Sequence, residues 1–197
     1  MTYNMYKDVK KEGDIMNNYE KIKSLLEKNN IHRQYLKILE ERGEVIRVIK
    51  GLYVAPDKDI NEFFIMGERY KTGIFSHNTA LYFYHLTDRT PMSLDMTFPS
   101  NVRVNNDFLE PHYIKPELHS LGETTLKLED GTNIKIYDLE RTICDIIRDR
   151  NKIDPQIFNT AMKEYFKSNK RNLNLLYKYA KKLKIDKILK KYMEVLD

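Results

Sequence analysis

The hydrophobic pattern of the chain changes its period after Gly43, and this change most limits what the N-terminal part can fold into. Before it, apolar residues recur every three or four positions over 19–26 and again over 31–39, a spacing typical of two amphipathic helices. After it, two short β-prone runs within 45–54 meet at Lys50-Gly51, which predicts a hairpin. We therefore expect helix, helix and hairpin in that order.

A helix followed by a basic hairpin is the order found at the end of a winged-helix DNA-binding domain. In such domains one helix lies in the major groove, while the hairpin touches phosphates or the minor groove. Arg33 can pair with guanine and Gln34 with adenine. An ordinary solvated helix is the alternative for this segment. The candidate DNA-binding residues are His32, Arg33, Gln34, Lys37, Arg47 and Lys50.

The rest of the chain predicts a mixed α and β segment followed by helices. Ser76 and Asp138 are expected to cap the N-termini of two of these helices. Helical patterns cover 60–70, 78–86, 139–147, 155–166, 173–183 and 185–196. Strand patterns cover 94–98, 112–114, 124–128 and 133–137, the last two joined by a turn with Asp-Gly chemistry.

These elements predict an α+β fold class, with an N-terminal winged helix-turn-helix domain followed by a mixed α/β domain that ends in a helical tail. The expected organisation is a flexible leader over 1–17, a DNA-binding domain over 18–56 and a C-terminal domain over 57–197. Pro56 marks the boundary between the two domains.

The net charge of +5 is unevenly distributed along the chain. The formal charge is +3 over 1–56 (11 basic and 8 acidic side chains), −5 over 57–150 (11 and 16) and +7 over 151–197 (12 and 5). Segregated charge is more informative about polyanion contacts than a basic average is. We therefore expect such contacts at the two ends of the chain.

The most basic segment lies in the last two predicted helices, where lysines alternate with apolar residues. One interpretation is a solvated face on helices whose other side is core. The other is a docking surface for an acidic partner or for DNA, because a dense basic patch raises association rates. The lysines concerned are Lys178, Lys181, Lys182, Lys184, Lys187, Lys190 and Lys191.

Composition excludes several classes of protein. Apolar residues make up 41% of the chain, enough for a folded core. The single cysteine, Cys144, excludes an intramolecular disulfide and a zinc site built from cysteines. No apolar run approaches the roughly 20 residues of a membrane helix, so we expect a cytoplasmic protein without membrane contact.

The search for catalytic groups predicts no catalytic residue, metal or cofactor. Ser76-His77 pairs a hydroxyl with an imidazole, but no nucleophile-elbow sequence surrounds it and helix capping explains the serine. The histidines His77, His85, His112 and His119 show no metal-ligand spacing on one helix face.

Acidic residues near 138–149 allow a rival interpretation, that of magnesium ligands in a nuclease. The candidate pairs are Asp138 with Glu140 and Asp145 with Asp149. The simpler expectation is that Arg141 bonds Asp145, four residues away, on an exposed helix face. Cys144 is expected to be a small buried residue rather than a reactive one.

Four strings in order resemble the AbiEi family of antitoxins from abortive-infection toxin–antitoxin systems. They are Lys50-Gly51-Leu52-Tyr53-Val54, Phe75-Ser76-His77-Asn78-Thr79-Ala80-Leu81, Met96-Thr97-Phe98-Pro99 and Tyr137-Asp138-Leu139-Glu140-Arg141-Thr142-Ile143-Cys144-Asp145. The resemblance runs from about Asn18 to the C-terminus. It implies a winged helix that binds inverted repeats at its own promoter, and a C-terminal domain that neutralises a nucleotidyltransferase-like toxin without a stable complex. The family is not known for a catalytic activity.

One feature departs from that family. Its members carry a helix-sized segment before the recognition helix, whereas here Asn29-Asn30 runs directly into Ile31-His32. Either residues are missing from the printed sequence or the DNA-binding module is shorter; the retained polar face and hairpin favour the first.

The sequence thus predicts a cytoplasmic antitoxin of an anti-phage system that also represses its own promoter. Two alternatives stay open: a metal-dependent enzyme acting on nucleic acid, and a non-catalytic protein-interaction module.

Overall fold

The computed structural model describes residues 33–49, 52–54, 56 and 61–196. Internal contacts divide the chain into two units. The first comprises residues 1–69 and 127–133, and the second comprises 70–126 and 134–197. The predicted leader over 1–17 and the helix expected over 19–26 lie outside the described residues.

In the first unit, helix α3 (Arg33–Glu41) ends at Gly43 as the sequence predicts. Gly43 adopts a left-handed φ of 68°, its amide donates to the Glu40 carbonyl, and the Glu44 amide donates to the Leu39 carbonyl at 2.9 Å. These two bonds satisfy carbonyls that the end of a helix leaves free. The glycine therefore fixes where α3 stops.

The predicted hairpin is confirmed. Strands β1 (Ile46–Ile49) and β2 (Leu52–Val54) pair antiparallel, with Arg47 opposite Tyr53 and Ile49 opposite Leu52. Helix α4 (Glu62–Arg69) follows. The described apolar core of this unit includes Leu39, Val45, Leu52, Val54 and Phe64. The helix-then-hairpin order is present, while the rest of the predicted winged helix-turn-helix falls outside the described residues.

The second unit contains a five-stranded sheet in the order β5-β4-β3-β7-β6. Its middle strand, β3, is only two residues long and pairs antiparallel with β4 and parallel with β7. Strands β4 and β5 are parallel. The strands are β3 (Ile74–Phe75), β4 (Leu94–Pro99), β5 (Leu109–Ile114), β6 (Glu123–Lys127) and β7 (Asn133–Tyr137).

Two strand expectations need correction. β5 begins at Leu109 rather than at His112, because it is an edge strand and an edge strand tolerates Pro111. β3 was not predicted, since a strand of two residues is too short to show an alternation of apolar and polar side chains. The hairpin of β6 and β7 is confirmed, with Gly131 at a φ of 83° in its turn.

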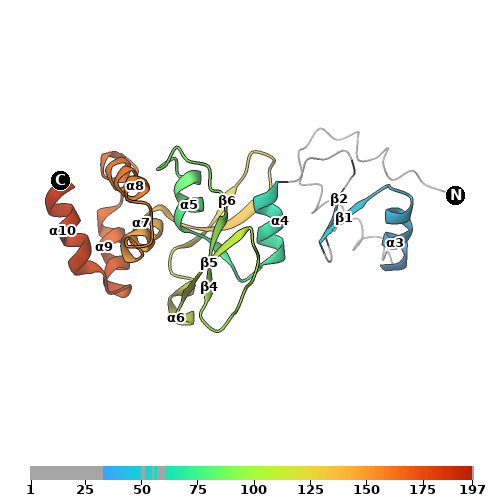
Figure 1. Cartoon of the computed structure of the whole chain (residues 1–197), viewed down its shortest axis with the longest axis horizontal. Helices are drawn as coiled ribbons and strands as arrows, with labels where there is room; N and C mark the ends of the chain where they lie inside the picture. Colours follow the sequence, from blue (N-terminus) through green and yellow to red (C-terminus); the bar gives the residue numbers. More distant parts are fainter. Residues whose placement is uncertain (1–32, 50–51, 55, 57–60, 197) are drawn as a thin grey trace. The chain divides into compact units, whose positions relative to one another are not determined.

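The helices of the second unit match the predicted tail closely. Asp138 caps α7 by accepting the Arg141 amide at 2.8 Å, as expected. Figure 1 shows α8, α9 and α10 gathered beside α7. The helices are α5 (His77–Phe83), α6 (Pro116–His119), α7 (Leu139–Arg148), α8 (Pro155–Lys167), α9 (Leu173–Lys182) and α10 (Asp186–Leu196).

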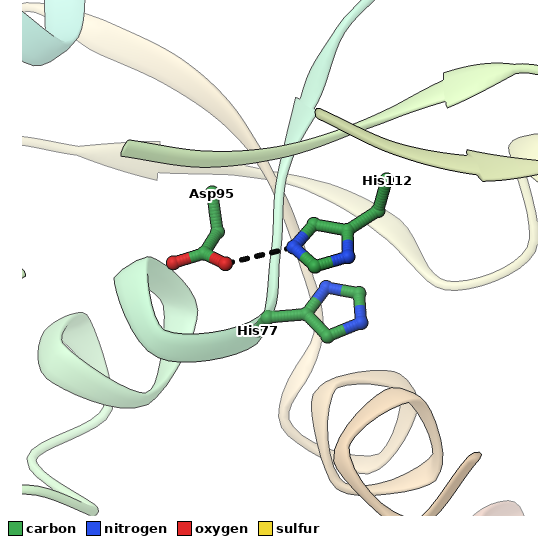
Figure 2. A group of neighbouring side chains, drawn as sticks. All are labelled: His77, Asp95 and His112. Atoms are coloured by element: carbon green, nitrogen blue, oxygen red, sulfur yellow. Dashed lines mark hydrogen bonds and ion pairs between the residues drawn. The ribbon is translucent and has the colours of Figure 1, made fainter. Parts of the chain in front are cut away.

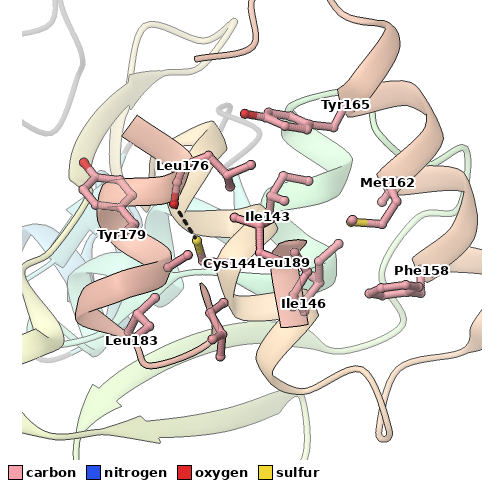
Figure 3. Packing of buried hydrophobic residues seen from close by; sticks show 14 of the residues in the cluster. Ile143, Cys144, Ile146, Phe158, Met162, Tyr165, Leu176, Tyr179, Leu183 and Leu189 are labelled. Atoms are coloured by element: carbon pink, nitrogen blue, oxygen red, sulfur yellow. Dashed lines mark hydrogen bonds between the residues drawn. The ribbon is translucent and has the colours of Figure 1, made fainter. Parts of the chain in front are cut away.

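Helix α7 is the centre of the hydrophobic core. Its Ile143, Cys144 and Ile146 are fully buried and face apolar side chains of the tail helices (Figure 3). Among these, Leu176 and Leu189 are also fully buried. The tail is therefore part of the core of the second unit and not an appendage.

The Arg141–Asp145 pair forms as predicted, but its expected exposure is wrong. The Arg141 Nε donates to Asp145 Oδ2 at 3.0 Å, and both side chains are 0% exposed. The guanidinium also donates to the carbonyls of Leu118 and Leu121 and covers the Tyr137 ring. The hydrophobic stripe of α7 faces the tail helices, and α6 with the following turn covers the side that carries Arg141 and Asp145. Helix α7 therefore has almost no solvated face.

Among the residues that the structure describes, no helix combines the length and the apolarity needed to span a membrane.

Candidate functional site

The candidate DNA-binding residues lie on α3 and on the hairpin, as far as they are described. Lys37 is exposed and lies 3.8 Å from the Glu41 carboxylate, one turn further along α3. Arg47 is exposed on β1. Arg33 and Gln34 belong to the first turn of α3, but their side chains are not described, and His32 and Lys50 fall outside the described residues.

The seven candidate lysines of the tail are all exposed, which confirms the amphipathic pattern. Lys178, Lys181 and Lys182 lie on α9, and Lys184 follows α9 with a φ of 59°. Lys187, Lys190 and Lys191 lie on α10. The tail thus offers a basic solvent-facing surface, here called the tail lysine surface.

A third group of side chains was not predicted as a site. His77, Asp95 and His112 converge in the second unit, where each offers one ligand atom and these atoms lie within 4.8 Å of one another. Figure 2 shows the two imidazole rings stacked, with Asp95 bonded to one of them. The ring centroids are 3.5 Å apart and the planes differ by 12°.

The sheet brings these residues onto one face. In the parallel pair β4–β5, Asp95 lies opposite Glu110 and Thr97 lies opposite His112. Since side chains two apart on a strand share a face, Asp95, Thr97 and His112 point to the same side. His77 joins them from the first residue of α5.

His77 occupies a left-handed backbone conformation, with a φ of 45°, at the first residue of α5. Such a conformation costs of order 1–3 kcal/mol in a residue other than glycine and is found most often at functional sites. The side chain is 1% exposed. The surrounding fold therefore offsets two costs at His77: the strain of its backbone and the loss of water around its imidazole.

Hydrogen bonds fix the orientation of the His77 ring. Its Nε2 lies 3.0 Å from Asp149 Oδ2, and its Nδ1 lies 3.0 Å from the Ser76 hydroxyl. Ser76 Oγ also accepts from the Thr97 hydroxyl at 2.8 Å. The Ser76 hydroxyl makes no capping bond in α5, so the expectation that capping accounts for this serine is wrong.

The protonation of this pair follows from its surroundings. Burial lowers the pKa of His77 below its usual value, although the hydrogen bond to Asp149 acts in the opposite direction. Burial raises the pKa of Asp149, but the hydrogen bond from His77 and the Arg148 guanidinium outweigh this and hold it well below its usual range. A neutral imidazole therefore donates from Nε2 to an ionised carboxylate.

Asp95 and His112 form a second hydrogen-bonded pair. The Asp95 Oδ1 lies 2.7 Å from His112 Nε2. The aspartate side chain is 5% exposed and the histidine side chain 17%. His112 is thus the ring of the two that reaches solvent.

The group opens into a pocket of about 360 Å³. Its walls come from α5, β4, β5, the end of α7 and the following turn. Asn78 Oδ1, in this wall, is buried and has no hydrogen-bond partner among the described residues. Acidic, basic and imidazole side chains line the pocket: Asp95, Glu110, Asp149, Arg148, Lys152, His77 and His112.

Of the acidic residues in the rival nuclease interpretation, Asp149 lines this pocket, whereas Asp138 and Asp145 are engaged elsewhere. Asp138 caps α7 and accepts a hydrogen bond from Tyr179 at 2.8 Å. Asp145 is occupied by Arg141 and lies 3.2 Å from Arg148. Cys144 is buried as expected, and burial raises the pKa of its thiol.

No spacing along the chain indicates the convergence of His77, Asp95 and His112. Their positions become related only through the parallel register of β4 and β5. The one local signal was the Ser76-His77 pair at the start of a predicted helix, which was interpreted as a cap.

Comparison of the chain with models of protein families and with curated proteins finds no match.

Proposed function

We propose that this protein is an antitoxin of an abortive-infection system that also binds and represses its own promoter. The observation that carries the DNA-binding part is the helix α3 followed directly by a hairpin with an exposed arginine, Arg47. The four strings that resemble the AbiEi family support the antitoxin part.

The expected DNA contacts follow from the chemistry of the side chains. A cation on a hairpin binds phosphate oxygens or enters the minor groove, so the exposed Arg47 would supply affinity with little sequence preference. Lys50, which lies outside the described residues, would do the same. Arg33 and Gln34 would supply base recognition from α3. If the promoter carries the inverted repeats that the resemblance implies, two copies of the protein would bind each operator.

The test is a binding titration with a fragment of the protein's own promoter at low salt. Arg47→Ala should weaken binding and reduce the steepness of its salt dependence, because one phosphate contact is lost. Arg42→Ala is the matched control, since Arg42 is also an exposed arginine but lies outside the hairpin, near Glu44. Equal binding by both variants and the unaltered protein would contradict the assignment of the hairpin.

For the antitoxin part, the tail lysine surface is the candidate contact with the toxin or with nucleic acid. Deleting 173–197 is a poor test, because Leu176, Ala180 and Leu189 are fully buried in the core. The double substitution Lys182→Glu, Lys187→Glu changes only exposed groups. If the surface acts in neutralisation, this variant should fail to rescue growth in cells that express the toxin, while promoter binding is kept.

The nuclease alternative finds little support in the described residues. Asp138 and Asp145, which it would use, are engaged in capping and in a buried ion pair. Substitutions that remove these charges would destabilise α7, so a loss of cleavage in such variants would not identify catalytic residues. Assays for magnesium-dependent cleavage of nucleic acid by the purified chain would test this alternative, and cleavage would overturn our preference.

A further inference from the structure

We propose that His77, Asp95 and His112 bind a divalent transition-metal ion, of the zinc, cobalt or nickel type. The site would lie in the second unit, independent of the DNA-binding elements proposed above.

The donor set suits such an ion. Two imidazoles and one carboxylate are ligands that zinc and its neighbours bind well, whereas magnesium and calcium prefer oxygen ligands alone. The ligand atoms lie within 4.8 Å of one another. In a tetrahedral zinc site with bonds of about 2.1 Å, ligand atoms lie roughly 3.5 Å apart. The ligand atoms would therefore have to move closer by about an ångström, in addition to the ring rotation described below.

The buried carboxylate of Asp95 also favours a cation. Asp95 is 3% exposed, and no lysine or arginine contacts its carboxylate among the described residues. A buried carboxylate needs a cationic or hydrogen-bonding partner, and a single imidazole is the partner present. Arg148 does not compensate, because it already pairs with Asp145 and Asp149.

Asp149 prepares His77 for this role. It accepts the Nε2 proton of His77, which leaves Nδ1 with a lone pair. A carboxylate that holds the distal nitrogen of a ligand histidine is the usual support in metal sites. The Ser76 hydroxyl now bonds that lone pair and is the group that an ion would displace.

Metal binding requires one rearrangement. Two rings stacked within 12° of parallel cannot both direct in-plane lone pairs at one ion. His112 is the ring that can turn, because it is partly exposed and lies on the edge strand β5. Its hydrogen bond to Asp95 would be replaced by bonds from both groups to the ion.

The pocket leaves room for a further ligand. Three protein ligands and an open side are the arrangement of zinc sites that bind water or a substrate. The unpaired buried Oδ1 of Asn78 lines the same pocket and would accept a hydrogen bond from such a water. A site of this kind, unlike a closed structural one, would exchange its outer ligand with solvent.

The test uses the full chain, stripped with a chelator and titrated with Co²⁺. We expect saturable binding with the visible absorption of tetrahedral or five-coordinate cobalt, and competition by Zn²⁺ but not by Mg²⁺. His112→Gln and Asp95→Asn should each weaken binding at least tenfold. His85→Gln is the matched control, because His85 is an exposed histidine outside the group, and it should leave binding unchanged.

Far-UV circular dichroism and the unfolding midpoint of each variant establish that it is folded. His112→Gln is the decisive substitution, since a partly exposed position on an edge strand tolerates it best. Absence of saturable Co²⁺ binding to the unaltered chain would overturn the proposal, as would equal binding by His112→Gln. In either case the contact between His112 and Asp95 is a hydrogen bond without a role in metal binding.

Discussion

Arg141 and Asp145 form an ion pair in which neither side chain reaches solvent: Nε of the arginine lies 3.0 Å from Oδ2 of the aspartate. Two carbonyls and the Tyr137 ring occupy other parts of the guanidinium. The arginine thereby ties α7 to the turn after α6. The pair is therefore a structural centre of the second unit.

Removing one partner of this pair should destabilise the protein strongly. Asp145→Ala leaves a buried guanidinium without its counter-charge, for which a loss of about 3–5 kcal/mol is expected in the free energy of unfolding. Lys167→Ala, which breaks an exposed pair with Glu164, should cost at most about 1 kcal/mol. Urea denaturation followed by circular dichroism measures both. Similar losses for the two variants would contradict the burial of the pair.

Gly122 should not tolerate a side chain. Its φ is 78°, and a Cβ at this position would lie 2.5 Å from the Cβ of Arg141. Gly43→Ala is the control, because Gly43 has a φ of 68° but open space around it. Gly43→Ala should cost only the backbone strain, about 1–2 kcal/mol. Gly122→Ala should lower the free energy of unfolding by more than Gly43→Ala does. An equal loss in the two variants would show that Arg141 moves away from the added methyl group at little cost.

Acid should destabilise the fold partly through His119. Burial lowers its pKa below the usual value of about 6.5, more than its hydrogen bond to the Thr97 carbonyl raises it. The unfolded chain therefore binds this proton more readily than the folded chain. The contribution of His119 to the free energy of unfolding is fully present above about pH 6.5. It is lost as the pH falls from that value through the lower pKa that His119 has in the folded protein.

The measurement compares the free energy of unfolding at about pH 7.5 and about pH 5 in the unaltered chain and in His119→Gln. The variant should show a smaller loss on acidification, since glutamine does not titrate. Other groups titrate equally in both chains and cancel in the comparison. An unchanged or larger loss in the variant would refute this role for His119.

Cys144 should resist thiol reagents in the folded protein. It is fully buried, and burial raises the pKa of its thiol, so little thiolate forms and the reagent has no access. Reaction with a chromogenic disulfide should be slow in buffer and fast in denaturant. Rapid reaction under native conditions would mean that α7 and α9 separate readily.

Local elements of the fold were predicted well. Gly43 ends α3, Asp138 begins α7, and the turn at Gly131 joins β6 to β7, each as the sequence indicates. These features depend on residues a few positions apart, whose side chains and backbone interact directly. The tail helices were predictable for the same reason, since their apolar stripes repeat within each helix.

The burial of α7 was not predictable from its own residues. A pair such as Arg141 and Asp145 looks solvated in isolation, because charged residues four apart usually lie on an exposed face. It is buried because α6 and the following turn cover it, and those residues lie outside the helix. The free energy that keeps the charges inside comes from bonds to segments remote in the sequence.

The sequence by itself determined the order of the longer helices and strands that the structure describes, the ends of several of them, and the basic face of the tail. Only the tertiary structure decided that His77, Asp95, His112 and Asp149 lie together. That decision depends on placing β4 beside β5 in parallel, with Thr97 opposite His112, and on a strained turn before α5. Hydrophobic periodicity shows which face of a strand is apolar, but it does not specify the neighbouring strand or its register.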